Sequence, residues 1–267
     1  MLTQLDLCSG VGAGFPLAGL QLGGFELIGL CERDDYCRDI LSKRFNSCYI
    51  HTDVRDTKEL NSIRTVFGEI DLISASPPCQ PFSVQGKRKG AADERDCFNA
   101  VCQAIARIQP KFFCIENVPG LLNCPYCPGA TRGYFRHILG YLSEFGYDAE
   151  WICVGSAHFG AAFIGERLLL VGSSRRLKLN WESATPWSEQ SREQVETART
   201  DWKRRGGKPG FPREAIRYPQ GMDISPGVKN GSSTIRRQRE AIGNSLDWRI
   251  AQLALRRVLY LNSLCIN

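Results

Sequence analysis

Histidine is scarce in this chain of 267 residues, which contains only His51, His137 and His158. The pair Cys124 and Cys127 has the CxxC spacing of half a zinc site. However, no second CxxC and no histidine pair at zinc-finger spacing accompany it. The sequence therefore predicts no bound metal.

Long apolar runs are also missing. No stretch of about 18 apolar residues occurs, which argues against a membrane-spanning helix. The first residues, 1–6, lack the basic and apolar segments of a secretory signal. The twelve cysteines lie in apolar stretches, so we expect most of them to be reduced and buried in a cytoplasmic protein.

The positive charge is concentrated in one part of the chain. The formal net charge is −3 for residues 1–172, +7 for residues 173–240 and +2 for residues 241–267. The basic segment also contains three of the five tryptophans. Such a surface fits a polyanionic partner, although a solvated and poorly packed segment would have the same composition.

Short apolar segments alternate with segments of helical periodicity over residues 1–172. The predicted strands cover residues 2–7, 25–31, 48–51, 70–74, 112–115, 149–154 and 167–172. The predicted helices cover residues 15–22, 35–45, 98–108 and 134–145. This alternation predicts an α/β fold with a doubly wound, mostly parallel sheet, which binds ligands at the carboxyl ends of its strands.

The middle of the chain differs from this pattern. Residues 173–240 have weak periodicity and many glycine and proline turn signals, which predicts a small, loop-rich second domain. Residues 248–261 return to a helical pattern. We therefore expect one catalytic and cofactor-binding domain over residues 1–172, completed by residues 241–267.

A glycine-rich loop with Gly10, Gly12 and Gly14 follows Asp6 and the first predicted strand. Glu32 lies 22 positions after Gly10, at the end of the next strand, where a carboxylate can bind a ribose diol. The pattern fits a dinucleotide site and an S-adenosylmethionine site equally, or a tight turn beside a surface glutamate.

Three prolines surround Cys79 in the segment Ser76–Ser83, directly after a predicted strand. Prolines restrict the backbone, and a nucleophilic thiol needs such placement. Glu116 ends the neighbouring predicted strand, within Glu116-Asn117-Val118-Pro119. A carboxyl group there could act as a general acid, or it could cap a helix.

Together with Ala241–Ser245, these segments resemble, in order, the motifs of the DNA (cytosine-5)-methyltransferases. The resemblance implies a Rossmann-like fold that uses S-adenosylmethionine and covers nearly the whole chain except roughly residues 173–212. It implies catalytic roles for Cys79, Glu116 and Arg167. The implied cofactor-binding residues are Asp6, Gly10, Gly12, Gly14, Glu32, Asp53, Pro78, Asn244 and Ser245.

The resemblance also implies a nucleic-acid surface. The loop of residues 82–92 contains three consecutive cations and could close over a flipped base, although a flexible, charged surface loop would look the same. Residues 173–240 would form a target-recognition domain. The expected nucleic-acid contacts are Ser83, Gln85, Lys87, Arg88, Lys89, Arg175, Arg176, Lys203, Arg204 and Arg205.

Two positions depart from the family pattern. Cys8 stands where the family usually has phenylalanine, and Gly165 occupies the place of an arginine in the segment before Arg167. Both departures suggest a divergent member with low or conditional activity.

The expected activity is methyl transfer to C5 of cytosine in double-stranded DNA, through a covalent bond from Cys79 to C6 and base flipping. The expected protein is a cytoplasmic monomer of a bacterium or phage, with a cognate restriction endonuclease as a further partner. Alternatives are a tRNA cytosine-5 methyltransferase, a nucleic-acid-binding protein with a degenerate methyltransferase fold, and an NAD-dependent enzyme.

Overall fold

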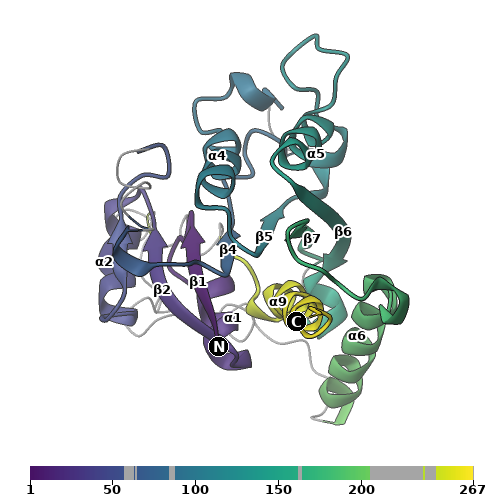
Figure 1. Cartoon of the computed structure of the whole chain (residues 1–267). Helices are drawn as coiled ribbons and strands as arrows, with labels where there is room; N and C mark the ends of the chain where they lie inside the picture. Colours follow the sequence, from purple (N-terminus) through teal and green to yellow (C-terminus); the bar gives the residue numbers. More distant parts are fainter. Residues whose placement is uncertain are drawn as a thin grey trace, which may run out of the picture.

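A computed structural model describes residues 1–56, 63, 65–83, 88–161, 164–204, 237 and 245–266. Its central element is a seven-stranded sheet in the order β3-β2-β1-β4-β5-β7-β6 (Figure 1). The strands are β1 (Leu2–Leu7), β2 (Phe25–Cys31), β3 (Tyr49–His51), β4 (Leu72–Ala75), β5 (Phe112–Asn117), β6 (Tyr147–Gly155) and β7 (Glu166–Ser174).

The first five strands are parallel, and β7 runs antiparallel to both β5 and β6. This confirms the predicted mixed, mostly parallel α/β sheet. The order reverses at β1, because the chain goes from β1 outward to β2 and β3 and then returns to β4 on the other side. Such a switch point opens a crevice at the carboxyl ends of the strands.

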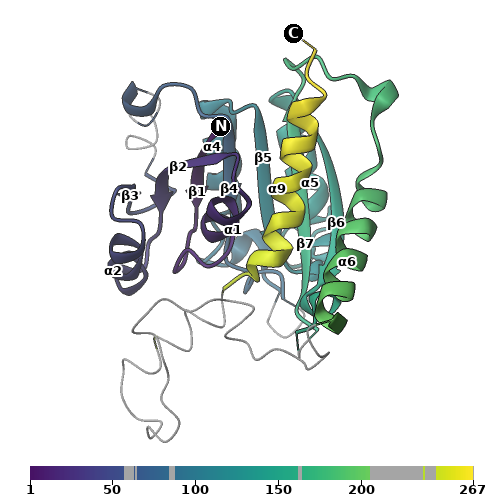
Figure 2. The same cartoon turned by 90° about the horizontal axis from the view of Figure 1, so that it is seen from below.

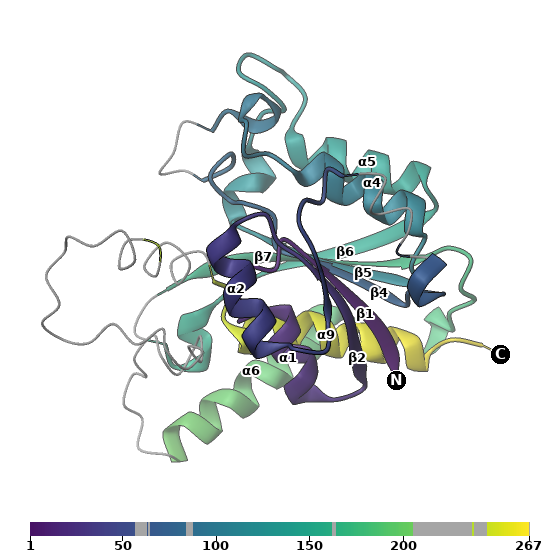
Figure 3. The same ribbon diagram turned by 90° about the vertical axis from the view of Figure 1, so that its left-hand side faces the viewer.

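Helices cover both faces of the sheet (Figure 3). The helices α4 and α5 pack on one face, and α1, α9 and α6 lie on the other. None of the described helices is long and apolar enough to cross a membrane. The helices are α1 (Phe15–Leu22), α2 (Asp35–Arg44), α4 (Phe98–Ile108), α5 (Tyr134–Glu144), α6 (Trp187–Arg204) and α9 (Trp248–Ser263).

Local sequence explains where these helices begin and which face they bury. Asp34 caps α2 by accepting a hydrogen bond from the Cys37 amide at 2.9 Å, and Asp247 caps α9 by accepting from the Arg249 amide at 3.0 Å. In α4, Phe98 and every third or fourth residue after it are buried, so one apolar stripe faces the sheet.

The segment after β7 differs from the prediction of a loop-rich domain. Residues 187–204 form the 18-residue helix α6, which packs beside α9 and the short helix at Ser156–Phe159 (Figure 2). The buried Trp187 anchors its beginning. The loop-rich expectation is therefore wrong for α6, because tertiary burial stabilises a helix whose sequence periodicity is weak.

A buried arginine joins α6 to the sheet. Arg257 of α9 is 3% exposed and contacts both carboxylate oxygens of Glu150 in β6, at 2.5 and 3.1 Å. It also donates to the Thr185 carbonyl and to Gln190 of α6, each at 2.8 Å. One guanidinium therefore connects the edge strand, α9 and α6.

Replacing Arg257 with methionine should lower the free energy of unfolding by roughly 2–3 kcal/mol, because it leaves a partly buried carboxylate and two other acceptors unpaired. Urea unfolding of Arg257→Met would measure this loss. Arg256→Met, at the neighbouring exposed position of α9, is the matched control and should change little. Equal losses in the two variants would contradict this account of Arg257.

Candidate active site

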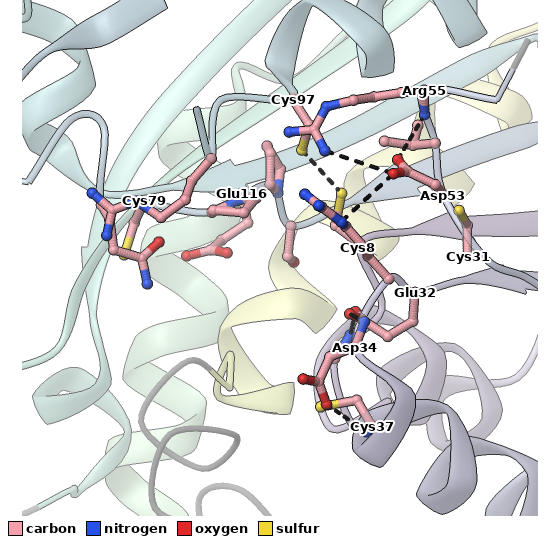
Figure 4. Close-up of a pocket in the computed structure, with 18 of the residues that line it drawn as sticks. Cys8, Cys31, Glu32, Asp34, Cys37, Asp53, Arg55, Cys79, Cys97 and Glu116 are labelled. Carbon is pink, nitrogen blue, oxygen red and sulfur yellow. Dashed lines mark hydrogen bonds and ion pairs between the residues drawn. The ribbon is translucent and has the colours of Figure 1, made fainter. Parts of the chain in front are cut away.

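A cavity of about 440 Å³ lies at the carboxyl edge of the sheet. Loops after β1, β2, β3 and β4 line it, together with the segment before α4 and residues of β5 and β7 (Figure 4). Its volume lies in the range of small-molecule sites. The structure brings these predicted site residues to the cavity wall: Gly10, Glu32, Asp53, Pro78, Cys79, Glu116 and Arg167.

Glu32 forms one end of the cavity. Its carboxylate accepts hydrogen bonds from the Gly10 amide at 2.7 Å and from the Asp34 amide at 2.8 Å. Gly10 has a φ of +54°, and a Cβ added there would point into open space. Burial raises the pKa of Glu32, while the backbone hydrogen bonds oppose this shift. The backbone thus orients a carboxylate beside open volume.

Asp53 lies near Glu32, after β3. Its carboxylate accepts from the Arg55 amide at 2.9 Å and lies 3.7 Å from both the Arg33 and the Arg55 guanidinium groups. This end of the cavity therefore contains both charge signs, with carboxylates that can accept hydrogen bonds from a ligand.

Three predicted cofactor residues support the cavity from outside instead of lining it. Asp6 is buried in β1 and accepts a hydrogen bond from the Ser74 hydroxyl at 2.5 Å. Gly12 and Gly14 face the protein interior, where an added Cβ would lie 2.4 Å from Phe45 and 3.0 Å from Leu246. These glycines allow close packing of the loop, and their predicted contacts with a cofactor stay a prediction.

Burial raises the pKa of Asp6 to about 7, although the hydrogen bond from Ser74 acts in the opposite direction. A carboxyl with a raised pKa in the folded state binds its proton more tightly there than in the unfolded chain. The protonated group therefore stabilises the fold at low pH.

Cys79 forms the other end of the cavity, and neighbouring strand ends determine its position. The Ser76 amide donates to the Leu7 carbonyl at 3.1 Å, and the Asn117 side-chain amide donates to the Pro77 carbonyl at 3.0 Å. The Ser83 amide donates to the carbonyl of Cys79 at 2.9 Å. Hydrogen bonds with β1 and β5, together with one inside the loop, thus hold the cysteine loop at the carboxyl end of the sheet.

Glu116 and Arg167 form an ion pair on the same wall. Arg167 Nε lies 2.9 Å from Glu116 Oε1, because antiparallel β7 brings its first residues beside the carboxyl end of β5. Glu116 is 7% exposed. Burial raises the pKa of Glu116, and the positive charge of Arg167 partly opposes the shift.

The thiol of Cys79 responds to the same charges. Burial raises its pKa, the Glu116 carboxylate raises it further, and the Arg167 guanidinium lowers it. The group is therefore mainly a thiol at neutral pH in the ligand-free protein. Proton transfer or ligand binding must generate the thiolate before it can act as a nucleophile.

The structure describes part of the predicted nucleic-acid loop. Ser83 follows the cysteine turn, and Lys89 is exposed. Arg88 instead donates to the Gly120 carbonyl at 3.1 Å, so its guanidinium is partly engaged within the protein. The predicted contacts Gln85 and Lys87 lie outside the described residues.

Arg175 and Arg176 are not brought to the cavity. They follow the end of β7, at the opposite edge of the sheet from Glu116. Arg175 pairs with Asp148 at 3.1 Å, and Arg176 donates to the Gln109 carbonyl at 2.7 Å. Both side chains are therefore partly engaged within the protein, and their predicted contacts with nucleic acid stay a prediction.

Other predicted residues lie further along the chain. Lys203 and Arg204 end α6, where Arg204 pairs with Asp201 at 2.7 Å. Ser245 precedes α9 and does not line the cavity. The predicted residues Arg205 and Asn244 lie outside the described part of the chain.

The cavity also contains residues absent from the predicted site. Arg95 lines it and makes a two-pronged hydrogen bond with Asp93, at 2.8 and 2.9 Å. This pair lowers the pKa of Asp93 to about 2. Cys8 and Cys97 meet on the wall with a sulfur–sulfur distance of 3.5 Å. Sequence spacing alone contained no signal for these pairings, except that Cys8 departs from the family pattern.

Comparison with known sequences identifies the relatives of this chain. A family profile described as C-5 cytosine-specific DNA methylase matches residues 2–246. The type II methyltransferase M.NgoMIV of Neisseria gonorrhoeae is 31% identical over 73% of this chain and 58% of its own length. The type II methyltransferase M.NaeI of Lentzea aerocolonigenes is 28% identical over 81% of this chain and 56% of its own length. The chain thus spans about half the length of the curated relatives it matches.

Solved structures share the fold. A DNMT2 mutant of Spodoptera frugiperda superposes with a TM-score of 0.63 at 14% identity, covering 97% of this chain and 100% of that one. The Dnmt2 methyltransferase of S. pombe gives a TM-score of 0.61 at 15% identity, covering 97% of this chain and 99% of that one. At these identities, the likeness concerns the fold alone.

Asp6 should produce a pH-dependent part of the stability. Its contribution should be fully present below about pH 4 and lost as the pH rises towards 7, amounting to at most about 4 kcal/mol. Asp6→Asn keeps a neutral hydrogen-bonding group. The free energy of unfolding of this variant should therefore fall less between pH 4 and pH 8 than that of the unmodified protein. Urea unfolding across this range would test the difference, and parallel curves for the two proteins would contradict it.

The reactivity of Cys79 should respond in opposite directions to its two charged neighbours. Glu116→Gln removes a negative charge and should move the midpoint of Cys79 alkylation to lower pH, whereas Arg167→Met should move it to higher pH. Mass spectrometry of the Cys79 peptide after timed iodoacetamide labelling would measure both midpoints. Shifts in the same direction would exclude this electrostatic arrangement.

Proposed function

Because the chain belongs to the C-5 cytosine-specific DNA methylase family, we propose that it transfers a methyl group to C5 of cytosine in DNA. The observation that carries this proposal is the arrangement of one cavity. A backbone-oriented carboxylate, Glu32, stands at one end, and Cys79 lies with the Glu116–Arg167 pair at the other.

The family uses S-adenosylmethionine as methyl donor, and the residues present fit this molecule. The oriented carboxylate of Glu32 can accept hydrogen bonds from a ribose diol. Gly10 leaves open space beside this carboxylate, and Asp53 offers acceptor oxygens for an adenine amino group. When bound, the donor would supply an electrophilic methyl group.

Cys79 would make the target carbon reactive. C5 of cytosine is a weak nucleophile until a thiolate adds to C6, which moves electron density towards C5. Cys79 would form this bond and leave again when the C5 proton is lost. The loop hydrogen bonds from Asn117 and Ser83 would keep its sulfur directed into the cavity.

Glu116 would bind the edge of the cytosine and donate a proton to the ring. A carboxyl whose pKa is raised by burial binds a proton more readily than a free carboxyl and can donate it to N3 as negative charge develops there. Arg167 would orient this carboxyl and help to bind the pyrimidine O2. When the base binds, its contacts would therefore replace part of the contact between Glu116 and Arg167.

A duplex hides this ring, so the target base must leave the stack, which costs about a few kcal/mol. The exposed Lys89 beside the cysteine loop is a candidate phosphate contact, as are Lys203 and Arg204 at the end of α6. We assign target recognition to residues 173–240, with residues 1–172 and 241–267 as the catalytic part.

The relatives named type II methyltransferases belong to bacteria, and another methyltransferase relative belongs to Bacillus phage SPR. They favour a bacterial or phage cytoplasm as the setting, and a cognate restriction endonuclease as a partner. We also propose that the chain acts as a monomer.

Methyl transfer provides the direct test. The protein should move a labelled methyl group from S-adenosylmethionine to cytosine C5 in duplex DNA, and Cys79→Ser should lower the rate at least roughly a thousandfold. Cys153→Ser, an exposed cysteine on β6, is the matched control and should keep the rate.

The remaining outcomes separate the alternatives. Label in tRNA alone would favour the tRNA methyltransferase, and nucleic-acid binding without any transfer would favour a binding protein. Transfer to DNA that survives in Cys79→Ser would overturn the covalent mechanism.

A further inference from the structure

Two cysteines from distant parts of the chain meet on the wall of the cavity. Cys8 Sγ lies 3.5 Å from Cys97 Sγ, although the residues are 89 positions apart (Figure 4). Cys8 belongs to the loop after β1, and Cys97 directly precedes α4. Both residues line the cavity, and Cys8 is partly exposed whereas Cys97 is buried, so a small solute that enters the cavity meets the pair mainly on the Cys8 side.

Both cysteines lie in segments that hydrogen bonds hold in place. Directly before Cys97, Asp96 accepts a hydrogen bond from the Tyr134 hydroxyl at 2.6 Å, and its carbonyl accepts from Arg55 at 3.2 Å. Directly after Cys8, the Ser9 amide donates to the Cys31 carbonyl at 3.0 Å, and Cys8 itself has a φ of +57°, a left-handed conformation that costs energy for a non-glycine residue. The close approach of the two sulfurs therefore follows from the fixed positions of both segments.

We propose that Cys8 and Cys97 form an oxidative modification site that takes a peroxide and closes into a disulfide. One thiolate attacks the peroxide O–O bond, which gives a sulfenic acid and releases one oxygen as water after protonation. The second sulfur then attacks the sulfenic sulfur and displaces the other oxygen as a second water. Two thiols lose two electrons, and hydrogen peroxide gains them.

The change in geometry is small but falls at a sensitive place. A disulfide needs a sulfur separation of about 2.05 Å, so the pair must close by about 1.5 Å. Cys8 lies two residues before Gly10, whose amide holds Glu32. Closing the bond would therefore pull on the loop that orients this carboxylate.

Burial and the contact with Cys97 raise the pKa of Cys8 well above its usual value. Because the thiolate is the reactive form, formation of the disulfide should be slow at neutral pH and faster as the pH rises.

The consequence for the methyl donor rests on the proposed function, whereas formation of the disulfide does not. The pair shares the cavity with Glu32, so the oxidised protein should bind the donor less tightly. The expected loss is at least about tenfold, because displacements near 1 Å in a binding site have effects of that size or larger. Reduction of the disulfide should restore the affinity.

Mass mapping tests the chemistry. After treatment with hydrogen peroxide, the cross-linked peptides that contain Cys8 and Cys97 should be about 2 Da lighter than the sum of the reduced peptides. The cross-link should be absent from Cys8→Ser and from Cys97→Ser and should persist in Cys153→Ser. A bond from Cys8 to Cys31, which also lines the cavity, or over-oxidation of Cys8 without a cross-link, would overturn the proposal.

Binding tests the consequence in a background without the catalytic thiol. In Cys79→Ser, calorimetry with S-adenosylhomocysteine should give weaker binding after oxidation and recovery with dithiothreitol. Adding Cys97→Ser should make the affinity insensitive to peroxide. Unchanged affinity with a mapped disulfide would refute the effect on the donor.

Absence of any binding by the reduced protein would instead count against the proposed function. The mapped cross-link would still decide the chemistry of the pair in that case.

Discussion

The ion pair between Glu116 and Arg167 is the interaction on which the site depends. It forms because β7 runs antiparallel to β5, so the first residues of β7 reach the carboxyl end of β5. A buried carboxylate without this partner would be costly. Burial makes the largest contribution to the raised pKa of Cys79, and the two charges of this pair act on it in opposite directions, so the sheet topology places both charged neighbours of the thiol.

Hydrogen bonds that involve backbone groups fix the remaining parts of the site. Asn117 holds the Pro77 carbonyl, and Gly10 holds Glu32, so both ends of the cavity are fixed by hydrogen bonds from strand ends. Behind them, Asp6 and Ser74 form a buried contact between β1 and β4. The groups that line the cavity are therefore held in place by hydrogen bonds from neighbouring strands and loops. Arg257 gives α6 a comparable support on the other side of the sheet.

Much of the fold could be predicted because its signals are local. The alternation of strand and helix patterns predicts β1, α1, β2 and α2 within a few residues of their observed bounds. The prolines around Cys79 predict the loop that follows β4. Helix α6 was missed, since its stability comes from burial of Trp187 and contacts with Arg257, which the periodicity of residues 187–204 does not contain. Tertiary contacts also determine where Arg175 and Arg176 lie. Their positive charge suggests a surface for nucleic acid, but both side chains donate to backbone carbonyls at the end of the sheet opposite the cavity.

The sequence by itself determined the order of the motifs, the reactive residue types and their place at strand ends, because these depend on neighbours along the chain. Only the tertiary structure decided which side chains meet. The pairing of Glu116 with Arg167, the support of the glycine loop by Phe45 and Leu246, and the contact of Cys8 with Cys97 all join residues more than 30 positions apart. Such contacts follow from strand order and packing, which bring together groups that no local pattern links.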